Sequence, residues 1–240
     1  MAETKQGSFP ATYHHIEAPT KEDKELGKLY KKRVLKVPEP PFMEDFRHPL
    51  YYYLYHNEWI VRRKLDGQNL RVYWNGEQAL WNGKSDAFTC GTSLVEYMNS
   101  TFLEEIFEEN FGREKEVWLF GEHMGPKVQG NELNLTKDTF VLFDVKVNDT
   151  WLSKENVCGI AEYFGIPTCY DFMPEAPTAS LCKIIAEVSE GKYKDWEGVV
   201  AVPTVEIRDQ QNHRIIVKVK NKDYYEARAN YEKYHGKATD

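Results

Sequence analysis

The chain has 240 residues and a formal net charge of −7 at pH 7. This length can bury a sizeable core, and we expect one folded domain rather than two small ones. The acidic charge excludes a protein that coats nucleic acid by bulk electrostatics, because non-specific affinity of that kind needs many Lys and Arg side chains. A local basic groove is still compatible with it.

The sequence predicts a soluble, cytoplasmic protein without a membrane partner. It contains no hydrophobic signal segment at its N-terminus and no apolar run of about 18 residues. The four cysteines form no C-x-x-C pair and no metal-ligand spacing with histidines, which is typical of reduced thiols in the cytosol.

Residues 1–50 form the first predicted segment. A polar arm precedes a helix that we expect from Thr20 to about Lys36, and residues 37–42 with their three prolines then form a stiff connector. Residues 21–36 carry seven Lys or Arg against three Asp or Glu. This basic helix is either a solvated face or a nucleic-acid contact, and the sequence leaves both open.

Residues 51–225 form the predicted main domain, and residues 226–240 a short tail. Alternating aromatic and polar residues predict a strand from Trp59 to Lys64, and the pair Asn75-Gly76 predicts the turn of a hairpin that ends near residue 81. The later elements follow from the same patterns: a helix over 92–110, strands over 116–122 and 139–147, helices over 153–164 and 178–190, and a closing hairpin with strands over 197–207 and 214–221.

The stretch KLDG, residues 64–67, places two charged side chains on one face of a strand. Lys64 and Asp66 lie two residues apart, so they share a face by the alternation of strands. A lysine amine is a nucleophile only in its neutral form, which partial burial or neighbouring cations favour. Gly67 would let the backbone approach a bulky ligand closely. The string alone is common by chance.

Further charged residues interrupt the later strands. Glu122 and Glu197 each stand at a strand end, where a surface role is the ordinary interpretation, whereas Asp144 lies among apolar residues and needs a partner or a ligand there. Lys218 and Lys220 share one face of the last strand. Together these residues suit a polyphosphate nucleotide with a divalent metal, because lysines bind phosphates and carboxylates bind the metal and the ribose.

Five motifs in order make the sequence resemble the covalent nucleotidyltransferases, which include ATP-dependent DNA ligases, RNA ligases and GTP-dependent capping enzymes. They are KLDG (64–67), FGE (120–122), VLFDV (141–145), EGVV (197–200) and IVKVK (216–220). The fold that this resemblance implies is α+β, an ATP-grasp-like domain of antiparallel sheets flanked by helices. A C-terminal OB-fold, which DNA ligases and capping enzymes carry, is not expected in this chain.

Details within the superfamily are similar to RNA ligases, the branch with phage and trypanosome RNA-editing enzymes. That branch favours asparagine five residues after the nucleophile, here Asn69, and GEHMGPKVQG (121–130) also resembles it. Arg71 keeps a DNA ligase alternative open, since a small loop shift could bring it to the position of Asn69. Lys84 stands where RNA ligases carry an arginine about 20 residues after the nucleophile.

The resemblance implies a role for each of these residues. Lys64 would attack the α-phosphorus of ATP, and Lys218 and Lys220 would hold the phosphates. Glu197 would bind Mg²⁺ or Mn²⁺. The nucleotide would be bound by Asp66, Gly67, Asn69, Lys84, Glu122 and Phe143, with Phe143 stacking on the base and Glu122 contacting the ribose. For Asp144 we expect a structural hydrogen bond.

The expected function is an ATP-dependent RNA ligase that joins 5′-phosphate and 3′-hydroxyl ends through a lysyl-AMP intermediate and an adenylylated 5′ end. The partners would be nucleic-acid ends, with RNA favoured, and the sequence does not indicate an oligomeric state. The alternatives are a compact DNA ligase, a capping guanylyltransferase and a non-catalytic nucleotide-binding relic. A relic is disfavoured because Lys64 and both closing lysines are present.

Overall fold

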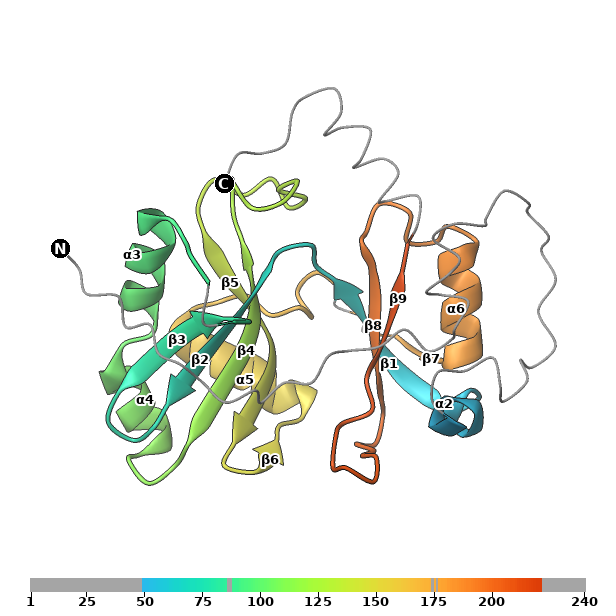
Figure 1. Ribbon diagram of the computed structural model, residues 1–240, viewed down its shortest axis with the longest axis horizontal. Helices are drawn as coiled ribbons and strands as arrows, with labels where there is room; N and C mark the ends of the chain where they lie inside the picture. Colours follow the sequence, from blue (N-terminus) through green and yellow to red (C-terminus); the bar gives the residue numbers. More distant parts are fainter. Residues whose placement is uncertain (1–48, 86–87, 174, 176, 222–240) are drawn as a thin grey trace. The chain divides into compact units, whose positions relative to one another are not determined.

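A computed structural model describes residues 49–221, except 86–87, 174 and 176. The described chain forms two compact units, one of residues 66–172 and one of residues 49–65 together with 173–221 (Figure 1). The predicted helix at 20–36, the connector at 37–42 and the tail at 226–240 lie outside the described residues.

The first unit is built on a five-stranded antiparallel sheet with the order β3-β2-β4-β5-β6. Its strands are β2 (Gln68–Trp74), β3 (Ala79–Gly83), β4 (Val117–Met124), β5 (Thr139–Val147) and β6 (Thr150–Trp151). The predicted hairpin turn is confirmed: the Asn75 side chain accepts hydrogen bonds from the backbone N–H groups of Glu77 and Gln78, and Gly76 has a φ of +93°. Such a positive φ is the reason a glycine follows the asparagine.

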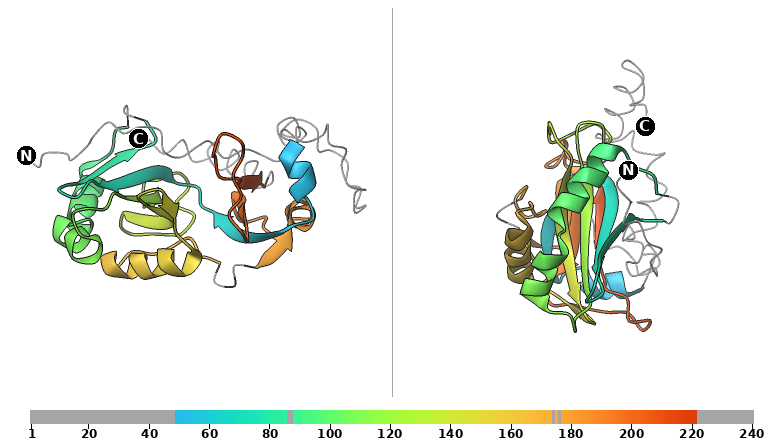
Figure 2. Two further views of the ribbon diagram at one scale, coloured as in Figure 1. Left: turned by 90° about the horizontal axis from the view of Figure 1, so that it is seen from below. Right: turned by 90° about the vertical axis from the view of Figure 1, so that its left-hand side faces the viewer.

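Three helices cover one face of this sheet (Figure 2). They are α3 (Thr92–Thr101), α4 (Glu104–Phe111) and α5 (Lys154–Phe164). The single helix predicted over 92–110 is wrong, because the chain breaks at Phe102. The buried Phe102 ring contacts the rings of Phe140 and Phe164, so packing against β5 and α5 outweighs the continuous helical pattern of the sequence.

The bounds predicted for α5 are confirmed, and its two ends show why. The Ser153 side chain accepts a hydrogen bond from the backbone N–H of Asn156, which caps the first turn. Gly165 follows the helix in the left-handed conformation at φ +62°. Sequence signals at both ends therefore fix this helix without tertiary information.

The second unit is built on a four-stranded antiparallel sheet with the order β7-β1-β8-β9. The strands are β1 (Glu58–Lys64), β7 (Thr178–Ser180), β8 (Gly198–Pro203) and β9 (Val217–Lys220), and the helices are α2 (Pro49–Leu54) and α6 (Leu181–Ser189). Helix α6 lies against one face of the sheet (Figure 1) and shares a core with Trp59, Val61, Val199 and Val217.

Several predicted bounds in this unit are corrected. The helix predicted over 178–190 begins only at Leu181, because Ser180 caps it by accepting a hydrogen bond from Lys183 N–H, and the three residues before it pair with β1. Strand β8 ends at Pro203, which has no N–H for the ladder. The short helix α2 was not predicted, because its six residues are too few for a helical period to stand out.

The α+β class with antiparallel sheets flanked by helices is thus confirmed. Within residues 49–221, no helix combines the length and the apolar character that a bilayer crossing requires.

Candidate active site

A buried glutamate joins two lysines where three strands of the second unit end. The register places Lys64 of β1, Gly198 of β8 and Lys220 of β9 in one row across the sheet. Glu197, directly before β8, forms ion pairs with Lys64 through Oε2 and with Lys220 through Oε1, the latter at 3.2 Å. Its side chain is 4% exposed, and a carboxylate so buried is stable only with such partners.

Gly198 allows this arrangement because it has no side chain. Its φ is +149°, and a Cβ there would lie 2.2 Å from the backbone oxygen of Val219. Next to it, Asn221 donates its backbone N–H to Glu197 O at 2.9 Å and its side-chain amide to Tyr193 O at 2.7 Å. The end of β9 is therefore fixed beside the start of β8.

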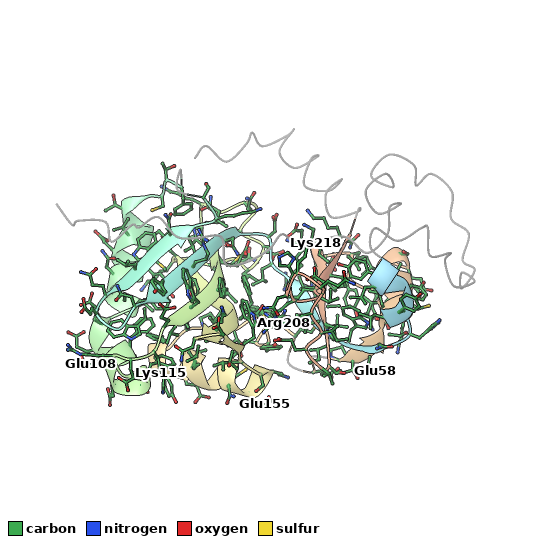
Figure 3. The ribbon with its side chains drawn as sticks, turned by 60° about the horizontal axis from the view of Figure 1, so that its bottom comes forward. Glu58, Glu108, Lys115, Glu155, Arg208 and Lys218 are labelled. Atoms are coloured by element: carbon green, nitrogen blue, oxygen red, sulfur yellow. The ribbon has the colours of Figure 1, made fainter. Side chains whose placement is uncertain are left out.

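Lys218 lies one row further along the same face. It pairs with Val200 of β8, which pairs with Arg62 of β1, so Arg62 and Lys218 occupy one row and Lys64 and Lys220 the next. Lys218 is labelled on β9 in Figure 3. This face of the sheet therefore gathers four cationic side chains, two of which are paired with the Glu197 carboxylate.

The residues before Lys64 and Glu197 contact each other on the opposite face. The Arg63 guanidinium lies 5.2 Å from the centre of the Trp196 ring, which stacks on Tyr193 at 5.0 Å. Arg63 precedes Lys64 and Trp196 precedes Glu197 in the chain. The contact between Arg63 and Trp196 therefore restrains the backbone next to both members of the Lys64–Glu197 ion pair.

In the first unit, Gly67 and Asn69 lie close to Glu122, and Asp66 directly precedes Gly67. Asn69 of β2 lies directly opposite Glu122 of β4. A Cβ on Gly67 would lie 2.3 Å from the backbone oxygen of His123 and 2.7 Å from Glu122 Cγ, so only glycine permits this approach of β2 to β4. The backbone N–H of Asp66 donates to Glu132 Oε1 at 3.2 Å.

Phe143 owes its position to a β-bulge. Phe120 pairs with Asp144 and Gly121 pairs with Leu142, which leaves Phe143 as the additional residue. A bulge turns the extra residue and its neighbour away from strict alternation. It brings Asp144 to the face of the sheet opposite the helices, where Asp144 is 4% exposed and Phe143 is half-buried.

Lys84 is exposed and follows β3 directly. Arg71 lies on the same face as Asn69 and donates hydrogen bonds to the backbone oxygens of Gly83 and Lys84. From the sequence, a small loop shift could have brought Arg71 to the position of Asn69. In the structure the two residues have different neighbours.

A polar network next to Glu122 was not predicted from the sequence. His123 Nε2 lies 2.8 Å from Asp138 Oδ1, and Ser93 Oγ donates to Asp138 Oδ2 at 2.5 Å. Burial lowers the pKa of His123, although the hydrogen bond to Asp138 acts in the opposite direction. No local pattern joins these residues, since 15 positions separate His123 from Asp138.

Among the described residues, no group of three or more His, Cys, Asp or Glu side chains could hold a metal ion. Glu197 is the carboxylate paired with Lys64 and Lys220 on the sheet face that carries Arg62, Lys64, Lys218 and Lys220, here called the lysine face. A single carboxylate fits Mg²⁺, which usually keeps several waters and is held by one or two carboxylates together with substrate phosphates. The donor set therefore fits a metal that arrives with a nucleotide.

The two antiparallel sheets, the strand-end lysine paired with a buried glutamate and the closing strand with two lysines are features that the nucleotidyltransferase resemblance predicts. The RNA ligase family profile matches residues 57–220. The chain therefore belongs to the RNA ligase family. No curated protein matches the sequence significantly.

Solved structures of an RNA ligase from Naegleria gruberi have a similar fold. The form with pyrophosphate is 16% identical, with a TM-score of 0.60, and covers 96% of this chain and 63% of its own. A mutant with ATP and manganese is 17% identical, with a TM-score of 0.58 and coverages of 94% and 62%. A mutant with AMP and manganese is also 17% identical, with a TM-score of 0.57 and coverages of 92% and 60%. The chain thus spans about three fifths of the length of these proteins.

Proposed function

We propose that the protein is an ATP-dependent RNA ligase that joins a 5′-phosphate to a 3′-hydroxyl through a lysyl-AMP intermediate. The observation that carries this proposal is the row of Lys64, Gly198 and Lys220 with Glu197 between the lysines. Membership in the RNA ligase family supports the choice of reaction. The similar Naegleria gruberi structures contain ATP, AMP, pyrophosphate and manganese, which supports the choice of ATP and a divalent metal.

In the first step, the neutral Lys64 amine attacks the α-phosphorus of ATP. The new N–P bond forms as the bond from the α-phosphorus to the bridging oxygen breaks, pyrophosphate leaves, and the amine releases a proton to water. Lys218 and Lys220 place positive charge where negative charge develops, a form of stabilisation that is large in a preorganised site. The proposed metal, Mg²⁺ or Mn²⁺, would be held by Glu197 and neutralise phosphate charge.

In the next two steps the AMP group moves to the strand end and is then displaced. An oxygen of the RNA 5′-phosphate attacks the adenylyl phosphorus, the N–P bond breaks, and Lys64 regains its proton. The 3′-hydroxyl oxygen then attacks the 5′-phosphorus and its proton passes to water. The bond from that phosphorus to the bridging oxygen of the pyrophosphate linkage breaks, and AMP leaves. Asp66, Gly67, Asn69 and Glu122 would hold the ribose and phosphate during these transfers.

Phe143 would stack on the adenine, a type of contact worth about 1–3 kcal/mol per base on an aromatic side chain. For Asp144 we retain the structural role expected from the sequence. The whole nucleotidyltransferase portion would extend over residues 51–225.

Intact mass after incubation with ATP, GTP or NAD and magnesium tests the first step. We expect the mass of one adenylyl group to be added with ATP, and no addition to Lys64→Ala. Lys183→Ala is the matched control, because Lys183 lies on α6 with a side chain that is 64% exposed. An adduct with GTP would instead indicate a capping reaction, and no adduct on protein free of bound AMP would contradict the proposal.

Labelled 5′-phosphorylated RNA and DNA ends of one sequence test the choice of strand. We expect sealing of RNA ends to be faster. Equal or faster sealing of DNA would replace RNA by DNA in the proposal and leave the lysyl-AMP chemistry in place.

A further inference from the structure

The end of strand β3 is held by an arginine that the proposed chemistry does not use. Arg71 of β2 is 5% exposed and lies opposite Asn82 of β3. Its Nε and Nη2 atoms donate to the backbone oxygen of Gly83 at 3.2 and 2.8 Å, and Nη2 also lies 3.3 Å from the backbone oxygen of Lys84. Only a guanidinium offers several donors in one plane for two successive carbonyls.

Two further contacts fix the same peptide units. The Asn82 side chain accepts a hydrogen bond from Gly83 N–H at 2.8 Å. A Cβ on Gly83 would lie 2.3 Å from the Phe88 ring, so the ring packs directly on the backbone there. Strand β3 is the outer strand of its sheet, and the end of an outer strand normally frays. These contacts oppose fraying up to Lys84, whose side chain remains exposed.

The β2–β3 register shows which residues lie near Lys84. Leu70 pairs with Gly83 and Arg71 with Asn82, so Lys84 directly follows the residue that is paired with the chain neighbour of Asn69. Asn69 lies opposite Glu122. Asn69 and Glu122 form a row on the face of the sheet opposite the helices, with a spacing of about 5 Å between neighbouring strands. Lys84 follows the end of the outer strand next to this row.

We infer that Arg71 is a positioning residue that presents the Lys84 ammonium to a phosphate of the RNA strand. This inference rests on the proposed ligase function for the identity of the ligand. The nucleotide phosphates already have Lys64, Lys218 and Lys220 in the proposed mechanism, whereas Lys84 stands next to the row that would hold the ribose. Apolar packing usually stabilises a sheet as well as a buried charge does. Stability of the sheet alone therefore does not explain why a buried arginine binds two backbone carbonyls, whereas the need to fix the position of Lys84 does.

Equilibrium binding of a 5′-phosphorylated single-stranded RNA to the full chain, followed by fluorescence anisotropy at several salt concentrations, tests the inference. Loss of one charge-assisted phosphate contact should weaken binding about tenfold. It should also reduce the slope of log K against log salt by about 0.7. We expect both changes in Lys84→Gln and in Arg71→Met, and near wild-type values in Lys84→Arg.

The double variant and a control separate positioning from direct contact. Because Arg71 acts through Lys84, the double variant should bind no more weakly than Lys84→Gln alone. Arg113→Met is the matched control, since it removes an arginine whose side chain is 67% exposed and pairs with Glu108. Arg71→Lys, which can satisfy one carbonyl, should fall between wild type and Arg71→Met and covers the case in which Arg71→Met does not fold.

Additive losses in the double variant would mean that Arg71 contacts the strand itself and would overturn the inference. An unchanged salt slope in Arg71→Met or in Arg71→Lys would also overturn it. An equal loss of AMP adduct formation in Lys84→Gln would assign Lys84 to the nucleotide instead. The ligase proposal is tested separately, because wild-type protein that binds RNA through Lys84 but forms no adduct would contradict that proposal alone.

Discussion

Replacing Gly198 by alanine should separate the two closing strands of the second unit and disable the lysine face. An alanine Cβ would lie 2.2 Å from Val219 O and 2.8 Å from Lys220 Cα, and the φ of +149° is one that side chains rarely adopt. Backbone strain of this kind costs about 1–3 kcal/mol, and overpacking adds about 1–3 kcal/mol. We therefore expect Gly198→Ala to lower the free energy of unfolding by about 2–6 kcal/mol.

The same change should reduce adenylylation beyond its effect on folding. The backbone can relieve the clash only by moving β9 away from β8, which would lengthen the 3.2 Å contact between Lys220 and Glu197. Urea unfolding measures the first effect. The initial rate of AMP adduct formation, measured well below the unfolding transition, gives the second.

Gly159→Ala is a control for which we expect the free energy of unfolding to change in the opposite direction. Gly159 lies inside α5, and a Cβ there would meet no atom within 4 Å. The same chemical change should therefore stabilise the protein by about 0.5–1 kcal/mol. If Gly198→Ala unfolded at the same urea concentration as the wild type, the steric reasoning about the β8–β9 approach would be refuted.

Two further outcomes follow from the buried charges. Glu197→Gln should lower the AMP adduct rate at least tenfold, because Lys64 would lose the charged group that orients its amine and the proposed metal would lose its carboxylate ligand. A hydrogen bond to a charged group is worth about 1.5–3 kcal/mol. A rate within twofold of wild type in intact-mass time courses would show that the bridge is dispensable. The lowered pKa of His123 means that the unfolded chain binds more protons below about pH 6.5, so stability should fall as the pH drops from there toward the folded pKa. Unfolding curves of wild type and His123→Gln at several pH values check this sign, and an identical pH slope in both proteins would assign the acid sensitivity to other groups.

Alternation along single strands predicts one part of the site well. The spacing of Lys218 and Lys220 places both on one face of β9, and the partly exposed Lys218 and the buried Val219 agree with this. The partner strands are a different matter. Lys64 and Glu197 are separated by 133 positions, and no local pattern shows that β1 pairs with β8.

Bulges and buried polar networks mark where sequence reasoning fails. Strict alternation would place Phe143 and Asp144 on opposite faces, but the register shift in β5 brings Asp144 opposite Phe120. The break at Phe102 and the His123–Asp138 pair likewise depend on neighbours that come from other elements. In each case tertiary packing decides the local structure, which a pattern along one segment does not contain.

The register of β2 bears on the choice between the RNA ligase and DNA ligase patterns. For Arg71 to take the place of Asn69, β2 would have to slide by two residues along β4, because a slip of one would turn every side chain to the other face. A slide of two would move Leu70, Val72 and Trp74, all fully buried, out of register with their partners on β4. It would also remove Arg71 from the carbonyls of Gly83 and Lys84. Whatever ligand this row binds, Asn69 is therefore the side chain that lies beside Glu122, and the apolar core of the first unit keeps it there.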